Sequence, residues 1–443
     1  MTATPAVAPA APPHSSKLYR DAASLASSSM LTAVLGIGFW AVCARYIPPA
    51  KLGVQTALLS IIVAPALVVA SGVGDAFTAV VPAAGELRPQ VVRRGYRLLL
   101  AMALPVAAGA AALAVTALPE VRFSLLTGLL VFAGVLIWAM FIAQDPALTS
   151  MGRAHWLPLE NGSVSLGKIA LLPPAIAVGV FEPVLVATLV PSVVAVSVLF
   201  PQVLRLSRRP SPRDAETGAL TEAVAGFSRM VQRTTASVAL SLGTLTATPF
   251  IVTAAAGPTQ GAVFSLALSV VQSLDFVGAA LGVSLVVHAS GAGPAGGRMA
   301  MIVFKRTAAV VGAGAVVLVI IAPFVLRTLN PRYLHLHGAV IIAILAAGSF
   351  SRCLYVIWAA LQRARREMRA LLVFNGTAAT AVLATMAPVS LRWGATGAAI
   401  VIAGANALLS SLAAGHLAWR HRRAGADPVP SGRHRVVAEA ARP

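Results

Sequence analysis

The stretch "GVQTALLSIIVAPALVVASGVGD", residues 53–75, carries no charge before its last residue, Asp75. A helix needs about 20 mainly apolar residues to cross a bilayer, so this stretch predicts a membrane-spanning helix. Similar runs recur along the 443-residue chain, which is 58% hydrophobic and only 11% charged. A soluble protein is about 25% charged. We therefore predict an all-α integral membrane protein.

Charges and turn residues divide the chain into about twelve spans. The predicted spans lie near residues 22–44, 52–78, 92–118, 123–145, 160–180, 183–205, 226–256, 258–286, 303–328, 335–360, 369–390 and 394–419. The polar connection "LSRRPSPRDAETGAL", residues 206–220, separates the sixth span from the seventh. The predicted parts are a disordered tail (1–16), an N-terminal six-helix lobe (17–205), a cytoplasmic linker (206–222), a C-terminal six-helix lobe (223–420) and a basic disordered tail (421–443).

The distribution of lysine and arginine predicts the orientation, because cytoplasmic loops of membrane proteins are enriched in them. With the N-terminus in the cytoplasm, 27 of the 34 basic residues fall on the cytoplasmic side, six fall outside and Arg352 falls within a span. Both termini are therefore expected in the cytoplasm. This distribution accounts for the net charge of +20 without a nucleic-acid partner. The excess of Arg over Lys is typical of a GC-rich genome, and we expect the inner membrane of such a bacterium.

Two features of the chain repeat. The stretch "GAVFSLALSVVQSLDFVGAALGV", residues 261–283, matches the first stretch at an offset of 208. A polar phrase also recurs: Arg153 and Asn161 of "SMGRAHWLPLENGS" correspond to Arg363 and Asn375 of "LQRARREMRALLVFNGT". Each phrase falls in the predicted cytoplasmic turn between the fourth and fifth helices of a lobe, where Asn caps a helix and Gly allows a tight turn. The repeats predict duplicated lobes, although both arginines also suit contact with an anionic lipid head group.

Three stretches carry a family resemblance. They are "GFWAVCARYIPPAKLGVQTALLSIIVAPALVVASGVGDAFTAVVPAAGE" (38–86), "DPALTSMGRAHWLPLENGSVSLGKIALLP" (145–173) and "LNPRYLHLHGAVIIAIL" (329–345). They resemble the first two helices, the connection between helices four and five, and the beginning of helix ten of polysaccharide-biosynthesis flippases. These flippases belong to the multidrug/oligosaccharidyl-lipid/polysaccharide exporter superfamily, and the resemblance covers roughly residues 17–420.

The resemblance implies a two-lobed transporter whose central cavity alternates between the two sides of the membrane. Its implied cargo is a polyprenyl-diphosphate-linked oligosaccharide, moved to the outer leaflet for cell-surface polysaccharide biosynthesis. Membrane lipids and a polysaccharide polymerase or glycosyltransferases are the other implied partners. No cofactor is implied.

Ionisable residues inside a membrane are costly and are candidates for function. Asp275 lies about 21 Å along its span, and Arg352 about 24 Å along its own, at about 1.5 Å per residue. Asp275 suits a proton-sensitive group, and the planar donors of Arg352 suit a diphosphate. The alternatives are a structural ion pair between them or with a neighbouring helix, and, for Arg352, snorkelling toward the cytoplasm.

Four further charged residues are candidates. Asp75 and Asp145 lie near the inner ends of the second and fourth spans, where they suit either transport coupling or a plain interfacial charge. Arg229 and Arg233 share one helix face because they are four residues apart. They suit a phosphate-attracting cavity entrance, or ordinary anchoring of a cytoplasmic helix end.

Hydroxylated residues gather in the first and seventh spans, which the repeat makes equivalent. They suit the lining of a hydrated cavity that holds sugar, or contacts between helices, which small and hydroxylated residues stabilise. The candidate lining residues are Ser28, Thr32, Thr235, Ser241 and Thr244.

Several function classes find little support. The phosphate-binding loop GxxxxGK[ST] of an ATP-driven pump does not occur. A membrane glycosyltransferase or ligase would need catalytic residues on a substantial outer loop, yet the short outer connections hold only Glu120 and Glu182 as acids. Because the outer connections hold so few acids, we expect no enzymatic activity. Cys43 and Cys353 lie in apolar helices outside any metal-binding motif, so we expect no metal site. A cation-coupled multidrug or metabolite antiporter, with Asp275 in coupling, is the main alternative.

Overall fold

The computed structural model describes residues 15–209, 217–289, 295–364 and 367–426, and these residues contain helices but no β-strand. The helices are α1 (Ser15–Tyr46), α2 (Pro49–Val80), α3 (Arg88–Ala117), α4 (Leu125–Ser150), α5 (Leu157–Ala177), α6 (Pro183–Ser207), α7 (Thr217–Val238), α8 (Thr244–Ala256), α9 (Pro258–Ala289), α10 (Ala295–Leu329), α11 (Arg332–His335), α12 (Gly338–Ala364) and α13 (Met368–Ala426).

Each predicted span corresponds to a helical segment. The seventh span consists of α7 and α8, joined by a π-helix at Ala239–Gly243. The eleventh and twelfth spans both lie in α13, which breaks at Gly394 (φ 59°, ψ −147°), a backbone conformation that glycine adopts without steric cost. Within the described residues, eight helical segments are long and apolar enough to cross a membrane. The chain is thus an all-α integral membrane protein, while the cytoplasmic position of both termini stays a prediction.

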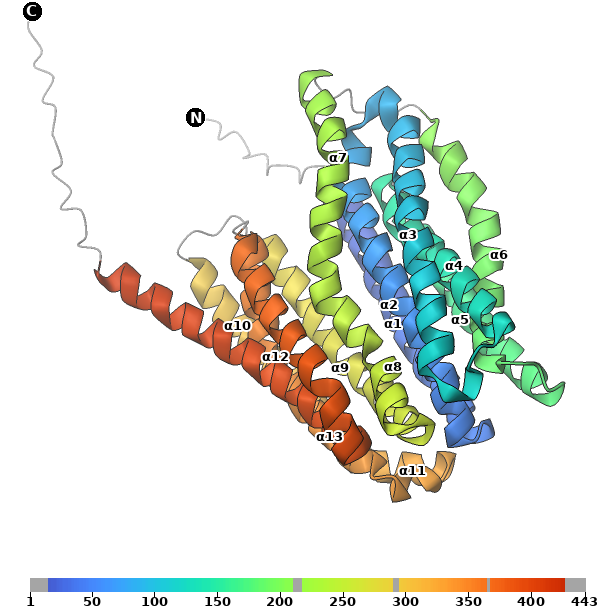
Figure 1. Ribbon diagram of the computed structural model, residues 1–443. Helices are drawn as coiled ribbons and strands as arrows, with labels where there is room; N and C mark the ends of the chain where they lie inside the picture. Colours follow the sequence, from blue (N-terminus) through green and yellow to red (C-terminus); the bar gives the residue numbers. More distant parts are fainter. Residues whose placement is uncertain (1–14, 210–216, 290–294, 365–366, 427–443) are drawn as a thin grey trace, which may run out of the picture.

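The helices form two lobes with the same internal packing (Figure 1). In the first lobe α2 packs on α3 and α4, and in the second α9 packs on α10 and α12 in the same way. The contact of α1 with α5 likewise recurs as the contact of α8 with α13. In the view of Figure 1, the N-terminal lobe (blue to green) and α9 to α13 (yellow to red) lie on opposite sides of α7 and α8.

A pair of glutamines marks the repeat at the level of single hydrogen bonds. Gln55 of α2 accepts the backbone N–H of Val184 at 2.7 Å, and Gln260 of α9 accepts that of Ala395 at 2.9 Å. Each bond caps the beginning of the sixth helix of its lobe, where the first N–H groups have no partner within the helix. Gln55 and Gln260 are 205 residues apart, so the offset of 208 expected from the sequence is wrong by three residues in this region.

The two lobes meet closely where α2 begins. A Cβ atom on Gly53 would lie 1.7 Å from the carbonyl oxygen of Pro258, the first residue of α9, so only glycine fits there. Thr253 Oγ1 lies 3.5 Å from the carbonyl oxygen of Gly53, to which it donates. Three residues before Thr253 in α8, the backbone N–H of Phe250 donates to Ser60 Oγ of α2 at 3.0 Å. This seam therefore joins α2 to α8 and α9 through backbone contacts.

The predicted tails fall mostly, and the predicted linker partly, outside the described residues. α6 ends at Ser207 and α7 begins at Thr217, whereas residues 210–216 of the predicted linker are not described. Residues 1–14 and 427–443 of the predicted tails are likewise outside the described residues. The domain boundaries stay predictions.

Candidate functional site

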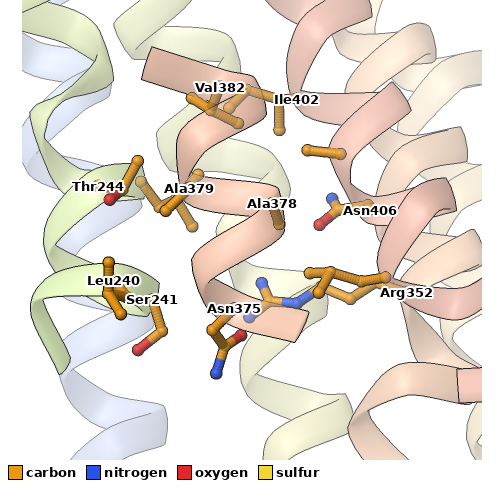
Figure 2. A pocket seen from close by; sticks show the side chains of 13 residues that line it. Leu240, Ser241, Thr244, Arg352, Asn375, Ala378, Ala379, Val382, Ile402 and Asn406 are labelled. Carbon is orange, nitrogen blue, oxygen red and sulfur yellow. The ribbon is translucent and has the colours of Figure 1, made fainter. Parts of the chain in front are cut away.

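A pocket opens in the C-terminal lobe between the π-helix, α8, α12 and α13 (Figure 2). It comprises about 480 Å³ of space free of protein atoms, part of it open to the surroundings. Its lining contains both apolar and polar side chains. The lining residues are Leu240, Ser241, Thr244, Leu245, Arg352, Asn375, Ala378, Ala379, Val382, Ile402, Ala405, Asn406 and Leu409.

The π-helix shapes one wall of this pocket. The hydroxyl of Ser241 donates to the carbonyl oxygen of Ser237 at 3.0 Å, and that of Thr244 donates to Ala239 at 3.1 Å, five residues back. The wider turn leaves backbone groups that side-chain hydroxyls can satisfy, and π-bulges of this kind are frequent at functional sites. The hydroxyl-rich sequence of this span thus places Ser241 and Thr244 on the pocket wall, as expected, while the π-helix itself was not predicted.

Arg352 is the charged residue of the pocket, and Figure 2 shows it reaching from α12 toward Asn375 and the π-helix. Its Nη1 atom donates to Asp275 Oδ2 at 3.2 Å, with 22% of the Arg352 side chain and 25% of the Asp275 side chain exposed. Its Nε–H is buried and has no hydrogen-bond partner among the described residues. Of the alternatives open from the sequence, the ion pair between the two is therefore present. This ion pair uses one N–H donor of the Arg352 guanidinium, which has several.

Asn375 is hydrogen-bonded to a residue of an aromatic cluster. Its Oδ1 atom accepts the hydroxyl of Tyr355 at 2.6 Å, and the Asn375 side chain is 8% exposed. The neighbouring Phe374 stacks on Trp358 with ring centroids 4.7 Å apart, and Trp358 Nε1 donates to His416 Nδ1 at 3.2 Å. Since Tyr355 occupies the oxygen, the amide NH₂ is the group that Asn375 offers to a ligand.

The repeated phrase has a different environment in the N-terminal lobe. Asn161 Nδ2 donates to Asp145 Oδ2 at 3.1 Å, across the turn from α4 to α5. Next to Asn161, Glu160 is only 5% exposed, and Tyr96 of α3, 3% exposed, lies within electrostatic range of both carboxylates. Sequence reasoning missed Glu160 and also Asn406 of the pocket. An acidic residue inside the repeated phrase, with no acid at the equivalent position of the second copy, was the available signal for Glu160.

The prediction that Asn161 and Asn375 cap helices is wrong. Both lie inside helices, in α5 and α13 respectively, and the turn before α5 is made by Gly152 (φ 74°) with Pro158 in the first turn of the helix. Proline is well suited to that position because its missing N–H would have no partner there. Arg153 does lie in the turn, with its guanidinium 5.9 Å from the ring centre of Trp156.

The remaining candidates do not line the pocket. Asp75 and Thr32 are exposed, and so are Arg229 and Arg233 on α7. Thr235 packs against α2, because a Cβ on Gly72 would meet its hydroxyl at 2.0 Å; it contributes to contact between helices, the alternative role.

Two candidates lie outside what can be described: the side chains of Ser28 and Arg363 fall in segments whose side chains the structure does not describe.

Comparison with solved structures gives the fold a context. No protein-family model and no curated protein sequence matches the chain. The lipid II flippase MurJ, in an inward closed conformation, superposes with a TM-score of 0.72 at 11% identity, over 88% of this chain and 86% of that one. A multidrug resistance MATE family transporter of the MOP superfamily, in its inward-facing conformation, superposes with a TM-score of 0.68 at 14% identity, over 91% of this chain and 98% of that one.

The outward-facing conformation of a multidrug resistance MATE family transporter of the MOP superfamily gives a TM-score of 0.56 at 15% identity, over 93% of this chain and 96% of that one. The chain has the fold of the MOP transporters. This confirms the two-lobed architecture of about twelve helices that the family resemblance implied. At these identities the likeness concerns the fold, and the cargo has to be argued from the chain's own residues.

Proposed function

We propose that the protein is an alternating-access transporter that flips a polyprenyl-diphosphate-linked oligosaccharide across the cytoplasmic membrane for cell-surface polysaccharide biosynthesis. The observation that carries this proposal is the position of Arg352 on the wall of the C-terminal pocket, with donors that Asp275 leaves unengaged. A cation inside a membrane protein is costly unless it has a partner or a task.

The chemistry of the pocket suits the two polar parts of such a cargo. A guanidinium binds phosphate oxygens through parallel, charge-assisted hydrogen bonds. The amides of Asn375 and Asn406 and the hydroxyls of Ser241 and Thr244, which all line the pocket, suit sugar hydroxyl groups, which both donate and accept. The apolar part of the lining suits the beginning of a lipid chain.

The test is a strain that lacks the gene, with its lipid-linked glycans measured by mass spectrometry. We expect a polyprenyl-diphosphate oligosaccharide to accumulate and the corresponding surface polymer to be lost. Expression of the wild-type chain should restore both, and so should Arg392→Gln, which removes an exposed arginine beside Trp393. Expression of the Arg352→Gln variant should restore neither the normal lipid pool nor the surface polymer. An unchanged lipid pool and unchanged surface polysaccharide would rule the proposal out.

A cation-coupled multidrug or metabolite antiporter is the second candidate, and one observation favours it. Asp145 is half-buried and Glu160 is buried in the N-terminal lobe, and neither forms an ion pair among the described residues, as carboxylates of a coupling site would. Hypersensitivity of the deletion strain to toxic compounds, with normal lipid-linked glycans, would favour the antiporter. Neither candidate is an enzyme.

A further inference from the structure

Arginines gather at one end of the N-terminal lobe, where α3 begins and α6 ends (Figure 1). The two helix ends are in direct contact: Nη1 of Arg88, the first residue of α3, donates to the carbonyl oxygen of Arg209, two residues after α6, at 3.4 Å. We expect this end to be cytoplasmic, because basic residues are enriched on that side. The exposed arginines on the two helices and directly after α6 are Arg93, Arg94, Arg97, Arg205, Arg208 and Arg209.

Arg88 differs from these neighbours because it is buried. It is 8% exposed, and the bond to Arg209 is the one hydrogen bond that its guanidinium forms with the described residues. Its Nε–H is buried without a partner, and neither ion pair found in the described part of the chain includes it. A guanidinium has five N–H donors, and burying a charged group without a partner is strongly unfavourable. Arg88 therefore requires an anion that the described side chains do not supply.

The surroundings of Arg88 add positive charge and little negative charge. Residues 87–119 and 183–213 contain no aspartate or glutamate. Glu86 is exposed, and it forms no ion pair with a described residue. No side chain caps the first turn of α3, and the beginning of a helix carries a partial positive charge that favours anions.

The position of Arg88 in the fold indicates which anion fits. One apolar segment long enough to cross a membrane begins at Gly85 and another ends at Ser207, so Arg88 lies at the level where lipid head groups meet the helices. A guanidinium binds phosphate oxygens through parallel, charge-assisted hydrogen bonds. Basic pockets between membrane-spanning helices bind anionic head groups in this way. Toward the middle of the membrane both helices expose apolar side chains, among them Leu100 of α3 and Val198 of α6, which suit acyl chains.

We propose that Arg88 is the centre of a binding site for the phosphate of an anionic glycerophospholipid, between the beginning of α3 and the end of α6. The exposed Arg208 and Arg209 at the end of α6 add positive charge beside it. The bound lipid neutralises the buried guanidinium and joins the two helices, so the N-terminal lobe is most stable in an anionic leaflet. The site lies in a different lobe from the pocket of Arg352, and its assignment does not depend on the cargo.

The test uses the full-length protein in nanodiscs of phosphatidylcholine, which has no net charge, or of an equal mixture of phosphatidylcholine and the anionic phosphatidylglycerol. Thermal unfolding is followed at fixed pH and ionic strength, and native mass spectrometry counts the phosphatidylglycerol molecules that the protein retains. We expect the mixture to raise the unfolding midpoint, because a ligand that binds only the folded state stabilises it. Inorganic phosphate added to phosphatidylcholine nanodiscs should have no effect beyond its ionic strength.

Variants make the test specific to Arg88. Arg88→Gln should weaken retention of phosphatidylglycerol about tenfold, the effect of losing a charge-assisted hydrogen bond. Arg88→Lys should keep part of it, because lysine retains the charge without the planar donors. The matched control is Arg97→Gln, which removes an exposed arginine of the same helix. Arg97 is nine residues further along and hence on the opposite helix face, so this change should leave retention unaltered.

Stability in phosphatidylcholine alone separates loss of the site from misfolding. There Arg88→Gln should unfold at or above the wild-type temperature, because it removes a buried charge without a partner. The proposal is overturned if the wild type unfolds alike in both lipids, if Arg88→Gln and Arg97→Gln respond alike, or if inorganic phosphate reproduces the shift. The last result would indicate a site for a free anion. Because no cargo is present, any of these results would leave the flippase proposal untouched.

Discussion

Asn161 and Asn375 occupy equivalent places in the two lobes, yet their surroundings differ. In the N-terminal lobe Asn161 donates to the carboxylate of Asp145, and its neighbour Glu160 is a buried acid. In the C-terminal lobe Asn375 accepts from the hydroxyl of Tyr355, and its neighbour Phe374 stacks on Trp358. The duplicated framework is thus kept while its chemistry has diverged: one copy gathers carboxylate oxygens, and the other offers N–H donors beside Arg352.

The largest effect should come from giving the C-terminal copy the acid of the N-terminal one. Phe374→Glu would remove the stacking on Trp358 and place a carboxylate beside an aromatic cluster. Loss of a fully buried aromatic ring costs about 3–5 kcal/mol; Phe374 is partly buried, and the introduced charge adds to the loss of packing, so we expect a destabilisation in about that range. Thermal unfolding of the full chain measures it, with Phe374→Leu as the matched, milder change. An unfolding midpoint like that of the wild type would show that the C-terminal copy tolerates an acid there, and that the chemistry of the two copies has diverged less than their surroundings suggest.

The next effect concerns the charge that only the C-terminal copy has. Charge-assisted hydrogen bonds contribute about 1.5–3 kcal/mol, so Arg352→Gln should weaken binding of a polyprenyl diphosphate roughly 10- to 100-fold. Asp275→Asn should instead tighten it, because the guanidinium would no longer be shared with the carboxylate. Binding can be measured by titration of the lipid into nanodiscs that hold the protein. Equal weakening by both changes would mean that the ion pair is structural and that the pocket does not use the free donors of Arg352.

A smaller effect is expected for the acid of the N-terminal copy. Glu160→Gln should stabilise the chain by about 1–2 kcal/mol, because the neutral amide replaces a buried carboxylate that interacts with the half-buried carboxylate of Asp145. Denaturant-dependent unfolding in choline chloride measures the difference. Destabilisation instead would indicate that Glu160 already has a stabilising partner. The N-terminal copy would then not differ from the C-terminal copy by an unpaired buried acid.

The smallest effect should follow from removing one hydroxyl. Tyr355→Phe deletes the bond to Asn375 but keeps the ring beside Trp358, and a single neutral hydrogen bond contributes about 1 kcal/mol. We expect a loss of about that size in stability and a few-fold weaker cargo binding, since Asn375 would no longer be held in one orientation. The matched change Tyr46→Phe, at an exposed ring, should alter neither property.

The sequence predicted the overall fold well because bilayer-spanning helices depend on apolar length and charge, both of which can be read from the chain. The twelve spans, their division into two halves and the break near Gly394 follow from such patterns. The π-helix at Ala239–Gly243 was not predictable in this way, since its turns differ from α-helical ones by a single residue in hydrogen bonding.

The candidate site was predicted in part. Ser241, Thr244, Arg352 and Asn375 do meet on one pocket, but Asn375 was selected as a turn residue. The surroundings of a buried carboxylate depend on packing between helices that are distant in sequence, as with Glu160 of α5, which influences Tyr96 of α3 electrostatically. For that reason the sequence revealed Asp145 as a candidate but missed the acid beside it in space.

The ion pair between Arg352 and Asp275 has an electrical consequence. Moving one elementary charge through the membrane potential changes the free energy by about 2.3 kcal/mol per 100 mV. A guanidinium bound to a carboxylate has no net charge, so a reorientation of the C-terminal lobe that keeps the pair together moves no net charge of its own through the field. Any voltage dependence of the transport cycle would then have to come from the cargo, from coupled ions or from other charged side chains, and a transport current would report on those alone.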